Sequence, residues 1–450
     1  MATAQPGSSE DKDLDLIPSD LPAQNASSTP PERRTRTLED RRYVAEAVTL
    51  GTRRSLDVPF PSPLPYDRQN RTSLDITLDW KPAARFALVL SDRPDVLEQD
   101  GQALWSRQTV RNALRDGYAS WEPFTRSYLE LGRINVRDGA ALGFSPTDFF
   151  RSRTLVGQTS LDPSVLRLNR LGTLMVRAQT IWNGGSASLL YAPKLFAPSA
   201  IATSALGIDP RFDATNATHR VLAETSTNVG DLSAQVLGYY EPHRAKLGLN
   251  LTYPLGQSII AYAEWAGGFD QNLIARAIDY GQATGTLPTG APPPIPSDPS
   301  RAFRNDAAVG GSWTIAAKVT VNLEYHLHQG GLSRGDWDRW FAAGEAMPKL
   351  AGELWYIRGY AADQIEPVAM HQVFVRADWP QAFVDHLALS GFAFVSLLDG
   401  STLSQITASY YLSDVWTATL SFAGNVGPPR SERGSIPQIA NGIAEIIRYF

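Results

Sequence analysis

Arginine is the residue type in this sequence whose number and spacing suggest a chemical role. Of 41 basic residues only six are lysines, so guanidinium groups carry most of the positive charge. A guanidinium binds carboxylates and phosphates in a planar, bidentate way that an ammonium group does not reproduce. Many of these arginines alternate with apolar residues and share one face of their segment with carboxylates and amides. The resulting set is Arg111, Arg115, Glu130, Arg133, Asn135, Arg137, Arg177, Arg244, Lys246, Glu264, Lys318, Glu324, Arg376 and Asp378.

Two roles are open to this polar set. If its face surrounds water, rings of Arg and Lys would favour anions. If the face is a closely paired wall, the same arginines would form a ladder of ion pairs, with Glu224 as a further acidic partner. We expect ion pairs for most individual residues, and an electrostatically zoned interior with some anion preference for the set as a whole.

Other reactive residues form no recognisable catalytic or metal-binding motif. His326 and His328 are two residues apart and share a face with Glu324, but no third ligand follows at a fixed spacing. His371 and His386 accompany many serines without a motif that selects a triad. There are no cysteines, and the Gly310-Gly311 pair lacks the lysine of a phosphate loop. We therefore expect no enzyme, no cofactor and no metal, and the net charge of -5 argues against nucleic acid.

Strict alternation is the main structural signal in the chain. In residues 318–328, five apolar side chains from Val319 to Leu327 alternate with six polar ones from Lys318 to His328. Residues 244–253 and 416–422 repeat this period of two, which is that of a β-strand and not of a helix. Similar segments read as strands over 42–51, 72–80, 83–92, 108–122, 126–137, 168–182, 184–192, 217–228, 231–241, 256–268, 303–316, 366–378, 383–398, 401–412 and 440–450. The total is 18, the even number expected of a single-chain barrel, with 16 as the lower bound.

The connections and the N-terminal residues complete the predicted organisation. Long links, such as 137–167, 269–302 and 329–365, tend to alternate with short ones, as external loops and periplasmic turns do in outer-membrane barrels. Residues 1–36 are rich in Ser, Pro, Asp and Glu and are predicted to be a disordered tail. Residues 37–65 are predicted to hold either a short helix or a first strand, followed by a loop, and 66–450 the barrel. Because the start lacks a charged and an apolar signal region, we expect the numbering to be that of a mature or trimmed chain.

A membrane barrel fits these patterns better than a soluble β-sandwich. No run approaches the roughly 20 apolar residues of a spanning helix, but barrel strands expose only alternate residues to lipid. The charged, bulky polar face suits a wide, wet lumen. The chain also ends in an alternating strand in which Ala444, Ile446 and Phe450 share one apolar face. Arg448 interrupts that face, and we expect its charged end to lie near lipid headgroups.

Two motifs make the chain similar to a known group of proteins. Residues 128–139 (YLELGRINVRDG) and 143–150 (GFSPTDFF) resemble the Gly-Arg strand and the following loop of porin-like outer-membrane β-barrel proteins. That group includes families of unknown function and relatives of the alginate-export channel. Residues 408–414, 433–437 and the closing strand are also similar to it. The resemblance implies a barrel of the bacterial outer membrane that passes solutes or polymers. It also implies that the final strand, with Ala444, Ile446 and Phe450, is the signal read by the barrel-assembly machinery.

The Gly-Arg strand contains a change of phase. Leu129 and Leu131 lie on one face, but Arg133, Asn135 and Arg137 follow at the same parity. A β-bulge at Gly132-Arg133 would reverse the phase and turn these polar residues inward together with Glu130.

The sequence thus predicts an all-β protein, a closed antiparallel transmembrane barrel with long external loops. We expect a passive outer-membrane channel for polar, anionic small solutes or saccharides, in contact with outer-membrane lipid. A non-conducting structural or adhesive barrel is the alternative, and a barrel hydrolase is a third.

Overall fold

The protein forms one closed antiparallel β-barrel in the computed structural model, which describes residues 36–53, 56–61, 67–99, 108–155, 160–200, 211–290, 292–315 and 318–450. The strands are β1 (Arg36–Thr52), β2 (Arg68–Ala83), β3 (Phe86–Asp92), β4 (Pro94–Gln99), β5 (Gln108–Asn112), β6 (Asp116–Phe124), β7 (Ser127–Ile134), β8 (Thr173–Trp182), β9 (Gly185–Ala192), β10 (Arg220–Val229), β11 (Leu232–Glu241), β12 (Arg244–Leu255), β13 (Ile259–Asp270), β14 (Ala302–Thr314), β15 (Thr320–His328), β16 (His371–Trp379), β17 (Leu387–Ser396), β18 (Thr402–Ser413), β19 (Trp416–Val426) and β20 (Gln438–Tyr449). The helices are α2 (Pro163–Leu168), α3 (Phe212–Thr215), α4 (Leu273–Ala283), α5 (Arg334–Ala346) and α6 (Ala351–Gln364), with a 3-10 turn η2 (Pro348–Leu350).

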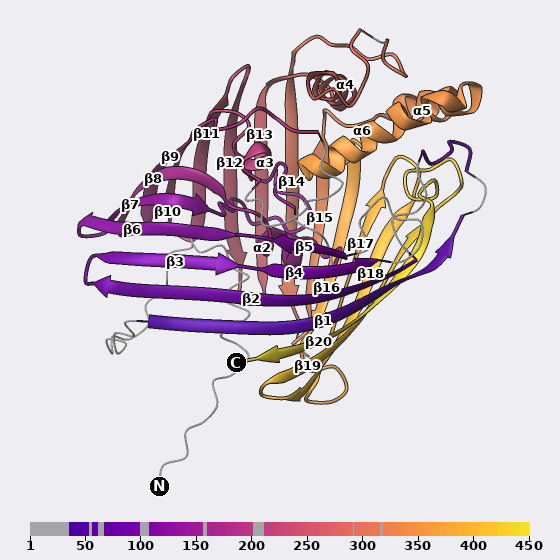
Figure 1. The fold of residues 1–450 in the computed structure, drawn as a ribbon. Helices are drawn as coiled ribbons and strands as arrows, with labels where there is room; N and C mark the ends of the chain where they lie inside the picture. Colours follow the sequence, from indigo (N-terminus) through magenta and orange to yellow (C-terminus); the bar gives the residue numbers. More distant parts are fainter. Residues whose placement is uncertain are drawn as a thin grey trace.

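The barrel closes where its first and last strands pair. β1 pairs with β2 on one side and with β20 on the other, so no edge is left open (Figure 1). Strands β3 and β4 both pair with β2, and on their other side β3 pairs with β6 and β4 pairs with β5. Strands β3 and β4 therefore lie end to end in one place of the wall, and β5 and β6 lie end to end in the next. The barrel has 18 strands around its circumference, as predicted.

The break between β5 and β6 is a bulge. The pairing register between Pro94 and Asn112 differs by one residue from that between Ser91 and Asp116. The extra residue lets Arg111, Ala113 and Arg115 all be buried, although the alternation on β6 then continues at the other parity. The sequence does not reveal this break. From the sequence, residues 93–107 are predicted to be a long link, but in the structure β4 continues the wall through part of this range.

The outer face of the barrel is apolar at its middle and aromatic toward its ends. Exposed aliphatic residues such as Leu131, Val236 and Leu323 lie on strands whose neighbouring side chains point inward. At one end of the barrel the exposed residues include Trp121, Trp182, Trp313 and Trp416, and at the other end Tyr191, Tyr240, Phe269 and Phe303. A central apolar belt between aromatic girdles is the outer surface of a membrane-embedded barrel. Among the described residues, no helix combines the length and apolar character needed to cross a membrane.

Strand β15 shows the predicted division of faces. Leu323 and Tyr325 are exposed, while Asn322, Glu324 and His326 are buried. Lys318 was expected on the inner face of this strand, and this prediction is wrong. It is exposed in the turn before β15, where its backbone has a left-handed φ of 58° and its amide donates to the Ile315 carbonyl.

The start of the barrel also differs from the prediction. Residues 36–52 form strand β1, so the helical alternative for 37–65 is wrong, and the wall begins well before residue 66. Pairing of β1 with both β2 and β20 explains this, because its backbone groups are satisfied by two neighbours. The predicted disordered tail lies outside the described residues, apart from its last member, Arg36.

The two ends of the barrel differ in their connections. Short turns join β8 to β9 at 183–184 and β18 to β19 at 414–415, on the end where Phe450 also lies. Most connections at the other end are long, with two short exceptions at 242–243 and 397–401. Helices α4, α5 and α6 cover part of this second end (Figure 1). They enclose an apolar core that includes Leu273, Trp340 and Leu354.

Candidate functional site: the barrel lumen

The segment between β7 and β8 folds into the barrel where the structure describes it, at 135–155 and 160–172, and these residues are called the inner segment here. It contains α2, whose start is capped by the Asp162 side chain accepting from the Ser164 amide. Most of its residues are buried although it belongs to no strand. Because such a segment must satisfy its own backbone groups, its partners on the wall decide how it is held.

Two wall carboxylates hold the first half of the inner segment. Glu264 on β13 accepts from the Ala141 amide at 2.6 Å and from the Ser145 hydroxyl at 2.7 Å. Glu324 on β15 accepts from the amides of Leu142 at 2.7 Å and Gly143 at 2.9 Å. Hydrogen bonds to ionised acceptors are stronger than neutral ones. We call Glu264 and Glu324 the carboxylate pair.

Glu324 has further partners of its own. The Tyr262 hydroxyl donates to it at 2.6 Å, and His326 Nε2 lies 2.7 Å from its other oxygen. The second histidine, His328, is bound in the same way to Asp306 at 2.8 Å. Both imidazoles are buried, and each has one ring nitrogen within hydrogen-bond distance of a carboxylate. No cluster of three or more metal-ligating side chains occurs among the residues that the structure describes.

The second half of the inner segment is held by an arginine and an amide. Arg376 on β16 donates to Asp162 and to the Ser164 hydroxyl, the latter at 2.7 Å. The Leu161 amide donates to the Gln405 side chain on β18 at 3.0 Å. The inner segment therefore crosses the lumen from β7 to the wall formed by β12–β18.

Small residues allow the inner segment to approach the wall this closely. Gly139 has a φ of 85°, and a side-chain carbon there would lie 2.5 Å from both carboxylate oxygens of Glu264. At Gly143, such a carbon would lie 2.7 Å from the rings of His326 and Phe374. Both positions need glycine for reasons of space, and Gly139 needs it for its backbone as well.

A different polar surface lies across the barrel from the carboxylate pair. Four arginines are buried on or directly beside β2–β5 and are called the arginine wall: Arg71, Arg93, Arg111 and Arg115. Strand β3/β4 is nine places from β14 in a ring of 18, so the two surfaces face one another. Asp75 pairs with Arg115, and Asp95 lies 3.4 Å from Arg93, so four arginines and two aspartates are buried on or beside these strands.

Most of the predicted polar set is inside the barrel. The buried members are Arg111, Arg115, Glu130, Arg133, Glu264, Glu324 and Arg376, and the partly buried ones are Asn135, Arg137, Arg177, Arg244, Lys246 and Asp378. Asn135 and Arg137 lie beyond the end of β7, in the inner segment. Ion pairs join several members to the wall: Arg177 to Glu130, Arg376 to Asp378, Arg244 to Asp270 and Lys246 to Asp306.

The phase change in β7 has a different cause from the predicted bulge. Gly132 pairs with Tyr118 and Met175 without a shift in register, so no residue is inserted at this position. Its φ of 144° instead redirects the chain, and both Arg133 and Ile134 are buried after it. The bulge occurs on the neighbouring strand, between β5 and β6.

The alternate residues at the end of the chain share the outer face of the barrel. Ala444, Ile446, Arg448 and Phe450 are all exposed on the outer face of β20. The guanidinium of Arg448 lies 4.4 Å from the centre of the Phe450 ring and 5.4 Å from that of Trp416. Its charge therefore lies among girdle aromatics at the barrel end, which suits the interface between lipid and water.

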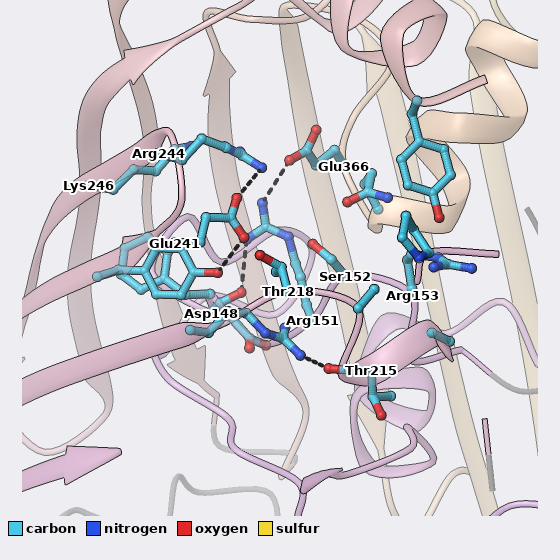
Figure 2. A pocket seen from close by; sticks show the side chains of 18 of the residues that line it. Asp148, Arg151, Ser152, Arg153, Thr215, Thr218, Glu241, Arg244, Lys246 and Glu366 are labelled. Carbon is cyan, nitrogen blue, oxygen red and sulfur yellow. Dashed lines mark hydrogen bonds and ion pairs between the residues drawn. The ribbon is translucent and has the colours of Figure 1, made fainter. Parts of the chain in front are cut away.

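A pocket of about 280 Å³ opens where the inner segment meets the long connections, and we call it the mouth pocket. Its lining comes from the inner segment, α3, the β11–β12 hairpin, α4 and the end of α6. Figure 2 shows Arg151 extending toward Glu366, with Arg244 beside Glu241. The charged lining residues are Arg151, Arg153, Arg220, Arg244, Lys246, Asp148, Glu241 and Glu366.

Arginine partners neutralise the acids of the mouth pocket. Asp148 accepts from Arg170 at 2.7 Å, and Glu241 accepts from Arg244 at 3.0 Å. Glu366 accepts from Arg276 at 2.6 Å. Burial acts to raise the pKa of Glu366, but the charges of Arg276, His328 and Arg151 outweigh it and hold this pKa well below its ordinary value.

Sequence reasoning did not find the mouth pocket. Arg151 lies in a long connection, where no alternation indicates the direction of a side chain. Arg220 and Glu366 lie near the starts of the predicted strands 217–228 and 366–378, where alternation does not show which charges a side chain meets. The SPTD motif at 145–148 did mark this part of the chain, because Pro146 and Asp148 line the pocket.

The chain is a closed antiparallel β-barrel with an apolar belt and a segment folded into its lumen. No family model and no curated protein matches its sequence. Solved structures that resemble it include two triple mutants of the porin of Rhodopseudomonas blastica, and a structure described as "Asymmetric conductivity of engineered proteins". Each is 10% identical and is matched along 92% of this chain and 100% of its own, with TM-scores of 0.40 and 0.39 for the two mutants and 0.40 for the third structure.

Proposed function

We propose that this protein is a bacterial outer-membrane channel that allows passive passage of small polar solutes and favours anions. The observation that carries the proposal is the inner segment, which crosses a polar lumen and is fixed to the wall at both of its halves. A segment held in this way narrows the bore without needing an energy source. Selection would then depend on the remaining width and on the charges that border it.

The arginine wall supports the anion preference. Strands β2–β5 bury four arginines but only two aspartates, Asp75 and Asp95. An excess of guanidinium groups in a low-dielectric passage attracts anions more strongly than the same charges would in water. Small anionic metabolites and acidic saccharides are the solutes that this charge would favour.

The outer surface supports the proposed location and partners. The apolar belt would contact outer-membrane lipid, and the girdle aromatics would lie at the headgroups. Ala444, Ile446 and Phe450 point outward on the closing strand, where the barrel-assembly machinery could read them.

Single-channel recording in planar bilayers tests the proposal. We expect discrete conductance steps and, across a potassium chloride gradient, a reversal potential of the sign for chloride preference. The double variant R71Q/R111Q should shift that potential toward the value of an unselective pore, because it removes half of the arginine wall. The control is R85Q, at an exposed position in the β2–β3 turn.

The possible outcomes separate the alternatives. A folded barrel without conductance would favour the non-conducting structural or adhesive barrel and contradict the channel. Conductance with cation preference would retain the channel and overturn the role of the arginine wall.

A further inference from the structure

We infer that the mouth pocket is a saturable binding site for a small organic monocarboxylate about the size of one six-membered ring. The inference rests on the proposed function and deepens it, because it gives the channel a stereospecific site in addition to bore and charge. It starts from Arg220, a lining residue on β10 whose charge is not neutralised by the wall.

Arg220 is buried, and no acidic side chain of the described residues lies within ion-pair distance of it. Its guanidinium donates to the Thr215 carbonyl and, at 3.3 Å, to the Thr173 hydroxyl, and it lies 4.7 Å from the centre of the Phe150 ring. Its Nε has no hydrogen-bond partner. A buried guanidinium without a counter-charge is energetically costly, so a bound anion would stabilise it.

The other charges of the pocket indicate the sign of the ligand. Asp148, Glu241 and Glu366 are each already paired with an arginine, as described above. These acids are therefore poor sites for a cationic ligand. Arg151 also lines the pocket, with an Nε that has no hydrogen-bond partner and an Nη1 that donates to backbone carbonyls. Among the described residues, the one carboxylate within ion-pair distance of it is Glu366, at 3.8 Å. The pocket therefore has a surplus of positive charge, and this charge favours an anionic ligand.

Size and lining indicate the rest of the ligand. Small-molecule sites generally have volumes of about 300–1,000 Å³, so a pocket of about 280 Å³ suits a ligand smaller than a typical drug. The lining combines hydroxyl groups, such as those of Ser152 and Thr218, with the rings of Phe149, Tyr280 and Tyr360. A ring that carries one carboxylate would place its charge near Arg220 and its body against these side chains.

The position of the pocket explains how binding would affect transport. Its lining includes Arg151 of the inner segment and Glu366, which follows the end of α6, and these two side chains lie 3.8 Å apart. A ligand bound between them would lie beside the narrowed lumen, at the end with the long connections. Occupancy should therefore reduce the ion current in a saturable way.

Isothermal titration calorimetry on the detergent-solubilised full chain tests the site without requiring conduction. The probes are benzoate and glucuronate, each with a neutral counterpart of the same ring, benzamide and glucose. We expect saturable binding of at least one carboxylate, at least tenfold tighter than its neutral counterpart. If benzoate and glucuronate differ, the tighter one shows whether the ring is apolar or hydroxylated.

Variants assign the binding to the pocket. R220Q should weaken carboxylate binding at least tenfold, whereas R220K should retain most of it and R339Q, on the exposed surface of α5, all of it. T218F should block binding by filling the pocket without removing a charge, which keeps the test valid if R220Q does not fold. Equal affinity for charged and neutral probes, or full binding by T218F, would overturn the site. Binding by a barrel that does not conduct would retain the site and overturn the channel.

Discussion

The two polar walls of the lumen use charge in opposite ways. Opposite the arginine wall, Glu264 and Glu324 direct their oxygens to the amides of the inner segment and are consumed in holding it. On and beside β2–β5, four buried arginines accompany only two buried aspartates, Asp75 and Asp95, although Arg115 also donates to the Asn169 side chain of the inner segment at 3.0 Å. A charged side chain that points into the barrel can therefore either hold another segment in place or select solutes. The groups that it contacts decide which of these roles it has.

Removing the charges of the carboxylate pair should have the largest effect on conductance and stability. The double variant E264Q/E324Q replaces ionised acceptors by amides, and hydrogen bonds to charged groups contribute about 1.5–3 kcal/mol each. We expect the inner segment to loosen, with larger single-channel conductance, greater current noise and a lower unfolding temperature. E98Q, at an exposed position on β4, is the control. Unchanged conductance and noise would mean that other contacts hold the segment.

Crowding the contact between the segment and the wall should have an intermediate effect. G139A adds a methyl group that would lie 2.5 Å from the Glu264 oxygens, on a backbone with a φ of 85°. G184A, in a turn with a φ of 83°, meets the same backbone strain of about 1–2 kcal/mol with nothing within 4 Å. We expect G139A to lower the unfolding temperature more and to raise current noise, which G184A leaves unchanged. Equal behaviour of the two variants would show that packing against Glu264 is unimportant.

Acidification should have a smaller effect, namely a loss of the stability that the ionised Glu366 gives to the fold. The pKa of Glu366 in the folded protein lies below the ordinary value of 4.5. Its ionised form therefore stabilises the fold fully above about pH 4.5, and this stabilisation is lost as the pH falls below that value. We expect the unfolding temperature to decrease on acidification below pH 4.5, and E366Q to make that decrease shallower. Parallel pH curves for E366Q and the unaltered protein would contradict this role.

The wall of the barrel could be predicted because its strands obey one local rule. Alternation in segments such as 318–328 reports which face meets lipid, and it requires no knowledge of the neighbouring strand. The errors occur where a distant partner decides the conformation. At the start of the chain the first-strand alternative is confirmed and the helical one is wrong, because residues 36–52 pair with β2 and β20. Lys318 lies in a turn that alternation does not reveal.

The site was less predictable than the wall. Glu264 and Glu324 have the same parity and chemistry as residues that face a wet lumen, so their attachment to the inner segment left no mark in their own sequence. Arg220 follows a long connection and is distinguished by the absence of an acidic neighbour, which a sequence cannot show. The glycines and the SPTD motif of the inner segment were the only signals that pointed to this part of the molecule.

The attachment of the inner segment also has a consequence for the order in which the molecule is assembled. The Ala141 amide and Glu264 are 123 residues apart in the chain, Leu142 and Glu324 182, and Leu161 and Gln405 244. A segment whose partners come so much later in the chain cannot reach its final position until those strands have formed. Contacts of such high sequence separation slow folding. Closure of the cylinder should therefore precede narrowing of its bore, so that each newly inserted copy passes through a wider, less selective stage.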